Sequence, residues 1–163
     1  MSSSLAYRID SDDEVRIRPV GPGPSTASEP EEPGAPAWLA RTVRAIHELR
    51  LLGPNWDTRG ASALDETAML LALELLHGAA SRDTPPPDVV PTVVGGIQLE
   101  WHRSRMDIEL DVSPDLRAGL YWLDRESGRE WEGPLTLRRP RELAEVIEEL
   151  TARTVRARPH GAR

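Results

Sequence analysis

The sequence predicts an α+β fold: an antiparallel meander of four to five strands, with two N-terminal helices and one C-terminal helix packed on one face. Two regular alternations of apolar and polar residues flank a short turn and predict a β-hairpin over about residues 96–112. Apolar residues at helical spacing precede this hairpin in two segments and follow it in one. Because helices and strands occupy separate stretches joined by short connections, consecutive strands are expected to be antiparallel neighbours.

The chain has 163 residues and a net charge of -7, which is consistent with one domain plus extensions. Residues 1–36 are predicted to be a disordered acidic tail and a Pro/Gly-rich linker, because segment 21–36 offers almost nothing to bury. Residues 37–158 are predicted to form a single domain, and 159–163 a flexible C-terminus. An alternation at Leu5, Tyr7 and Ile9 gives the tail a second interpretation, a peptide that docks on a partner's sheet edge.

Composition excludes several classes of site and predicts a compartment. The chain contains no cysteine, which rules out disulfides, cysteine-based zinc sites and thiol nucleophiles. Its start lacks the basic and apolar regions of a secretory signal, and its longest apolar run, 68–73, is far shorter than the ~20 residues of a membrane span. A cytoplasmic protein with no membrane association is therefore expected.

Three helices are predicted, each from its apolar period and its ends. The first begins near Ala37, includes Leu51 and Leu52 in its apolar set, and stops at Gly53-Pro54. The second covers about 64–77, with Ser62 as its cap, Asp65 as the capping-box acid and Gly78 as its C-terminal cap. Pro140 opens the third in the first-turn position that proline favours.

The strand region begins where the period of the apolar residues changes to two. Two pairs of valines, Val89-Val90 and Val93-Val94, with Pro91 between them, predict an edge strand, and Gly95-Gly96 predicts the turn that follows. The core side of the hairpin is predicted to hold six residues: Ile97, Leu99, Trp101, Met106, Ile108 and Leu110. A fourth strand over 120–123 and a fifth over 131–137 follow, with Gly128 in the turn between them.

The opposite side of the hairpin is the first candidate site. It presents five polar residues that could hold a divalent metal or supply a general acid and base: Glu100, His102, Asp107, Glu109 and Asp111. One-sided burial gives the same alternation without any function, so a solvated face is the alternative. An acidic face also suits a basic partner, unless Arg103 and Arg105 in the turn neutralise it.

A second candidate is Asn55-Trp56-Asp57, between the first two helices. These residues could bind a ligand, or they could build the loop, with Trp56 packed and the polar side chains satisfying backbone groups. The five tryptophans could form a stacking surface, but most occupy core-phase positions, and single-strand binders need a basic groove.

Other chemistry has weak support in the sequence. No pair of histidines has the HExxH spacing, and no GxSxG, P-loop or GxGxxG motif occurs, so an enzyme is less expected than a binding protein and no cofactor is predicted. The basic cluster at the C-terminus, Arg153, Arg156, Arg158 and Arg163, is compatible with nucleic acid but also suits a helix C-terminal dipole.

Two separated motifs resemble a family of small bacterial proteins with no established activity. Residues 52–57, LGPNWD, followed by Gly60-Ala61, are similar to that family's NWDGYGA segment, and Gly95-Gly96 with 97–101, IQLEW, is similar to its GGIQLEW strand pair. The sequence departs from the family at Thr58, Arg59 and Val93-Val94. The resemblance implies a shared domain over roughly residues 45–135 and implies no activity.

Together these patterns predict a non-catalytic protein–protein interaction module of the bacterial cytoplasm: an adaptor, an accessory subunit or an antitoxin-like neutraliser. Its partner would be another protein, bound through the N-terminal tail or the acidic sheet face. Two alternatives remain open at this point. One is a metal-dependent hydrolase or nuclease that uses the acidic face, and the other is nucleic-acid binding through the arginine-rich C-terminal helix.

Overall fold

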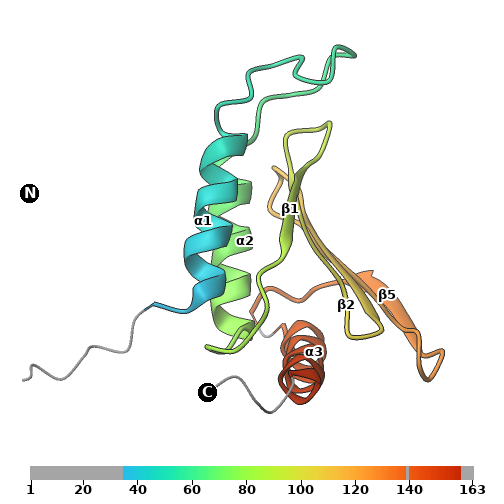
Figure 1. Ribbon diagram of the computed structural model, residues 1–163. Helices are drawn as coiled ribbons and strands as arrows, with labels where there is room; N and C mark the ends of the chain where they lie inside the picture. Colours follow the sequence, from blue (N-terminus) through green and yellow to red (C-terminus); the bar gives the residue numbers. More distant parts are fainter. Residues whose placement is uncertain (1–34, 139, 159–163) are drawn as a thin grey trace, which may run out of the picture. The chain divides into compact units, whose positions relative to one another are not determined.

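The computed structural model, which describes residues 35–138 and 140–158, has the predicted α+β architecture (Figure 1). The three helices are α1 (Ala37–Leu49), α2 (Glu66–Ala79) and α3 (Arg141–Ala157). The five strands are β1 (Asp88–Pro91), β2 (Ile97–Arg103), β3 (Met106–Val112), β4 (Ala118–Asp124) and β5 (Glu130–Pro134). They form one antiparallel sheet in the order β1-β2-β3-β4-β5, so the meander is confirmed. Residues 1–34 of the predicted tail and linker, with the docking peptide, and residues 159–163 lie outside the described residues.

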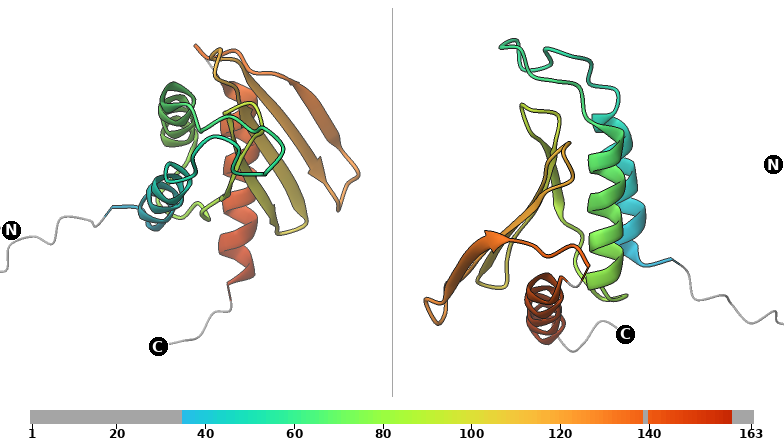
Figure 2. Two further views of the ribbon diagram at one scale, coloured as in Figure 1. Left: turned by 90° about the horizontal axis from the view of Figure 1, so that it is seen from above. Right: turned by 180° about the vertical axis from the view of Figure 1, so that it is seen from behind.

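The helices form a layer on one side of the sheet, which we call the inner face. Helix α2 contacts β2, β3 and α3, and α1 contacts β1. Figure 2 shows the three helices on the same side of the curved sheet and no described helix on the other side, which we call the outer face. The prediction that the helices pack on one face is therefore confirmed.

The β2–β3 hairpin has the extent and orientation that the sequence predicts. Its turn is Ser104-Arg105, and both residues have positive φ, 52° and 59°, as a two-residue hairpin turn requires. Trp101 lies opposite Ile108 in the register. All six residues that were assigned to the core are buried on the inner face: Ile97, Leu99, Trp101, Met106, Ile108 and Leu110.

Two tryptophans fix the connection between the helices and the sheet. Trp38 and Trp101 are fully buried, and their indole N–H groups donate to the carbonyl oxygens of Ser81 and Pro85, each at 2.8 Å. Both acceptors lie in the stretch that links α2 to β1. Core packing is thus confirmed for these two indoles, while Trp56, Trp122 and Trp131 are only partly buried.

The predicted helix ends were wrong in three places. Helix α1 stops at Leu49, because Leu51 and Leu52 bond to carbonyls three residues back in tighter turns, and the Leu51 side chain is 76% exposed. Asp65, and not Ser62, caps α2, since its side chain accepts from the N–H groups of Thr67 and Ala68. Gly78 lies inside α2, which continues to Ala79.

The turn between β1 and β2 also differs from its prediction. Val93 and Val94, expected in the strand, occupy the tip of the turn and are 59% and 61% exposed. The Gly95 N–H donates to the Thr92 carbonyl, and Gly95 has a φ of 87°, which a glycine adopts without strain. A Cβ at Gly95 would lie 2.7 Å from the Ala63 carbonyl oxygen, so the 53–65 loop packs directly against this turn.

Candidate functional site

The outer face of the sheet is strongly acidic. The strand register places seven carboxylates on it: Asp88, Glu100, Asp107, Glu109, Asp111, Glu130 and Glu132. All five predicted face residues are therefore brought together, and β1 and β5 add three more acids. Cross-strand partners share one face because opposed side chains in a sheet project in the same direction.

His102 lies between two of these carboxylates. Its Nδ1 is 2.7 Å from Asp107 Oδ1, and its Nε2 is 3.3 Å from Glu100 Oε2. The hydrogen bond to Asp107 is the largest cause that raises the pKa of His102, and the bond to Glu100 adds to it. With both ring nitrogens facing carboxylates, the imidazole is held in its protonated form more strongly than a free histidine.

Asp107 is already engaged by a second cation. The Arg125 guanidinium binds it through Nε at 2.5 Å and through Nη2, and this pairing is the main reason that the pKa of Asp107 is lowered. The neutralising arginine is thus Arg125 from the β4–β5 turn. Of the two hairpin arginines that could have neutralised the face, Arg103 lies in a hollow with Arg41 and Arg44 on the α1 side, and Arg105 lines another hollow with Glu126.

The centre of the face sets like charges against each other. Glu100 lies directly opposite Glu109, and Glu109 is followed across the sheet by Tyr121 and Glu132. Glu109 accepts a hydrogen bond from Gln98 Nε2 at 3.0 Å, which orients its carboxylate without neutralising it. Opposed like charges destabilise a sheet, so we expect Glu100 and Glu109 together to lower the free energy of unfolding.

One end of the outer face is hollowed. An open depression of about 550 Å³ has Asp111, Arg117, Gly119, Tyr121 and Glu132 in its lining. Desolvation, followed by the charge of Glu100, raises the pKa of Asp111. Arg117 is paired with Asp115, so the two carboxylates beside Tyr121 suit an amine or guanidinium side chain.

Asn55-Trp56-Asp57 builds its own loop. The Asn55 side-chain oxygen accepts from Gly60 N–H at 2.7 Å, and the Trp56 indole donates to the Ser62 carbonyl at 3.1 Å. Asp57 accepts from the N–H groups of Ala61 and Arg59, and these bonds lower its pKa. The structure therefore uses all three side chains within the loop.

The loop that contains Asn55-Trp56-Asp57 and the turn at Gly95-Gly96 meet in space. Ser62 N–H donates to the Val93 carbonyl at 2.9 Å, and Asp65 N–H donates to the Gly95 carbonyl at 2.8 Å. The loop is thus bonded to the β1–β2 turn, at an end of the sheet, and it does not lie on the outer face. The contact gives both motifs a shared structural role.

The donors for the two alternative functions are arranged less favourably. Within residues 35–138 and 140–158, no group of three or more His, Asp or Glu side chains is placed to hold a metal ion. The described arginines of the C-terminal cluster face acids: Arg153 binds Asp124 and Glu149, Arg156 lies 3.8 Å from Glu149, and Arg158 lies 3.7 Å from Asp83.

Sequence reasoning missed several members of the outer face. Tyr121, Arg125, Glu130 and Glu132 were not selected, because strands β4 and β5 were recognised without assigning which side each residue faces. The signal was present: Glu130 and Glu132 alternate with Trp131 and Gly133, as the polar and apolar residues of the hairpin do.

None of the described helices has the length and apolar character needed to cross a bilayer. Compared with known proteins, the chain matches no family model, no curated protein and no solved structure.

Proposed function

We propose that this protein is a non-catalytic binding module of the bacterial cytoplasm whose outer sheet face docks on a basic surface of another protein. It would act as an adaptor, an accessory subunit or an antitoxin-like neutraliser. The observation that carries the proposal is the acidic face, which no described helix covers, with Glu100 opposite Glu109 and no ion pair at Glu109 among the described residues. A basic partner would relieve this repulsion and gain electrostatic steering.

The face is a better docking surface than either edge of the sheet. Both edge strands are short and contain a proline: β1 has four residues with Pro91, and β5 has five with Pro134. Short edges, prolines and charges discourage the addition of another strand. Tyr121, near the centre of the face, adds an amphipathic side chain of the kind enriched in interfaces.

The two alternatives have less support from the geometry. A metal-dependent hydrolase or nuclease on the acidic face could not use Asp107 as a free ligand or base, because this carboxylate is already bound by Arg125 and His102. Binding of nucleic acid through α3 would need free arginines, and Arg153 is paired with Asp124 and Glu149.

Co-purification from native lysate with matched baits tests the proposal. The outer-face variant is Glu109→Arg/Glu132→Arg, which flanks Tyr121. The control is Glu74→Arg/Glu148→Arg, which makes the same change of charge at exposed positions on α2 and α3. We expect one stoichiometric basic protein to bind the wild type, a 37–163 truncation and the control, and to be lost from the outer-face variant.

Two outcomes would contradict the proposal: no stoichiometric partner on any bait, or a partner that the outer-face variant retains. Loss with the truncation alone would assign docking to the tail instead. The wild-type complex should also weaken as salt rises, because opposite charges across an interface are screened.

A further inference from the structure

A second surface lies on the inner face, between strands β4 and β5 and helix α3. Trp122 and Trp131 face each other across these strands, and both are partly buried. With the buried side chains of Met106 and Val146 they line a groove of about 490 Å³. We call this the tryptophan groove.

Helix α3 lines the groove with carboxylates. Glu142, Glu145 and Glu149 are three and four residues apart, so they lie on one stripe of the helix. Arg153 binds Glu149 at 2.6 Å, whereas Glu142 and Glu145 have no ion pair with any residue that the structure describes. With Asp124, the groove has four carboxylates against two guanidinium groups, those of Arg129 and Arg153.

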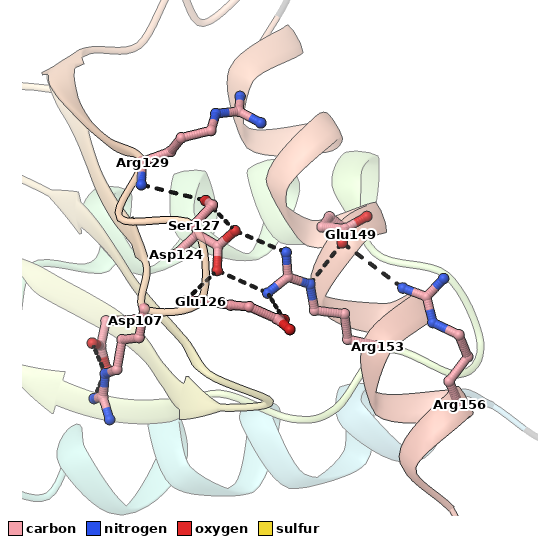
Figure 3. A network of polar contacts seen from close by, with 9 residues as sticks. Asp107, Asp124, Glu126, Ser127, Arg129, Glu149, Arg153 and Arg156 are labelled. Atoms are coloured by element: carbon pink, nitrogen blue, oxygen red, sulfur yellow. Dashed lines mark hydrogen bonds and ion pairs between the residues drawn. The ribbon is translucent and has the colours of Figure 1, made fainter.

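Trp122 already binds one cation. The Arg129 guanidinium carbon lies 5.6 Å from the centre of the Trp122 ring, within the range of a cation–π interaction. Arg129 is exposed in the β4–β5 turn, and no ion pair holds it within the described part of the chain. Figure 3 shows its side chain extending from the turn beside α3.

The Trp131 ring packs against the backbone of its own strand. A Cβ at Gly133 would lie 2.9 Å from this ring, so the indole packs directly over the glycine two residues along β5. A ring that is already oriented loses little conformational entropy when a ligand stacks on it.

From these contacts we propose that the tryptophan groove binds an arginine side chain of a partner protein. The guanidinium stacks on the indoles with its N–H groups toward Glu142 and Glu145, and Arg129 is the resident cation that competes for the site. Arginine fits better than lysine because its planar, weakly hydrated fork both stacks and donates to two carboxylates. This site goes beyond the proposed function, because it lies on the opposite side of the sheet from the outer face.

The test uses the full chain and a small probe, N-acetyl-arginine amide, with the uncharged isostere N-acetyl-citrulline amide as its control. The readout is the chemical shift of the Trp122 and Trp131 indole N–H groups, assigned from single Trp→Phe variants. We expect the arginine probe to shift both signals and the citrulline probe to shift neither.

Surface variants then show whether the probe binds this groove or is attracted by the overall negative charge. Glu142→Gln/Glu145→Gln should weaken binding of the arginine probe by about threefold or more, while Glu148→Gln, elsewhere on α3, should leave its binding unchanged. Arg129→Gln should strengthen binding about two- to fivefold, because it removes the competing cation.

The proposal would be overturned if the arginine probe left the indole signals unshifted, or if the citrulline probe bound as well as the arginine probe. It would also be overturned if Glu148→Gln weakened binding as much as Glu142→Gln/Glu145→Gln, or if the probe bound Arg129→Gln no more tightly than the wild type. None of these readouts depends on the outer face. Failure of this site and failure of the proposed function are therefore distinguishable.

Discussion

The two faces of the sheet each carry an aspartate–arginine pair, and the two pairs differ in their surroundings. On the inner face Asp124, 6% exposed, accepts from both terminal nitrogens of Arg153 at 2.9 Å and from Ser127 and Glu126 (Figure 3). On the outer face Asp107 binds Arg125, whose side chain is 56% exposed, against 19% for Arg153. The inner pair joins the end of β4 to α3, while the outer pair joins β3 to the β4–β5 turn.

The difference between the two pairs indicates which charged groups stabilise the fold. In the described residues no buried side-chain nitrogen or oxygen lacks a hydrogen-bond partner, so the polar groups enclosed by the helices are satisfied. The outer face instead keeps Glu100 opposite Glu109, an arrangement that lowers stability. A destabilising feature that folding does not need is the kind that binding sites retain.

The largest expected effect is the difference in stability between a substitution on the inner face and one on the outer face. Trp101→Ala should reduce the free energy of unfolding by about 3–5 kcal/mol, because it empties a fully buried site and leaves the Pro85 carbonyl without its donor. Glu109→Ala, on the outer face, should change it by no more than about 0.5 kcal/mol. Urea unfolding measures both, and equal values for the two variants would mean that the faces are misassigned.

The next comparison concerns the two ion pairs. Arg153→Met should lower the melting temperature by several degrees, since it leaves the enclosed Asp124 carboxylate short of its main partner, while Arg125→Met should lower it little. Arg153 is the largest cause that lowers the pKa of Asp124 from 3.8. The stabilisation of the fold by the Asp124 carboxylate is therefore present above about pH 3.8 and is lost as the pH falls. The difference in melting temperature between wild type and Arg153→Met should therefore narrow in acid. A difference in melting temperature that does not change with pH would contradict this account.

The hairpin and its orientation could be predicted from the sequence because a period of two fixes which side chains share a face. The alternation of Ile97, Leu99 and Trp101 with Gln98, Glu100 and His102 was sufficient. The ends of the helices could not be predicted as well, since they depend on tertiary contacts. Ser62 and Asp65, for example, donate their backbone N–H groups to the β1–β2 turn, and the helix begins only after Asp65.

The membership of the candidate face could be predicted only in part. Its hairpin residues follow from local alternation, but Glu130 and Glu132 join them only through the register of β5 on β4. Arg125 belongs to a turn, and nothing in the spacing of the sequence indicates that it reaches Asp107 on β3. Asn55 and Asp57 look like ligand-binding groups, and only the fold shows that the loop backbone uses them.

His102 offers a direct measurement of the outer-face charge. NMR titration should give it a pKa above 6.5, and Asp107→Asn should lower that pKa, because the bond to Asp107 is the largest cause of the shift. For a raised histidine pKa, the stabilisation is fully present below pH 6.5 and is lost as the pH rises through the folded-state value. The His102 signal is identified by its absence from the spectrum of His102→Gln. An unchanged His102 pKa in Asp107→Asn would show that another group stabilises the protonated imidazole.

The smallest effect tests the claim of repulsion itself. Glu109→Gln keeps the acceptor for Gln98 and removes one of two opposed charges, so it should raise the free energy of unfolding by about 0.3 kcal/mol at low salt. The gain should vanish near 1 M salt, where the screening length falls to about 3 Å. Glu148→Gln, on the exposed side of α3, is the matched control and should show no such gain. If Glu109→Gln stabilises the fold while weakening the complex with the partner, the charge of Glu109 is retained for binding at the expense of stability. If Glu109→Gln destabilises the fold, the Glu109 carboxylate contributes to the stability of the sheet.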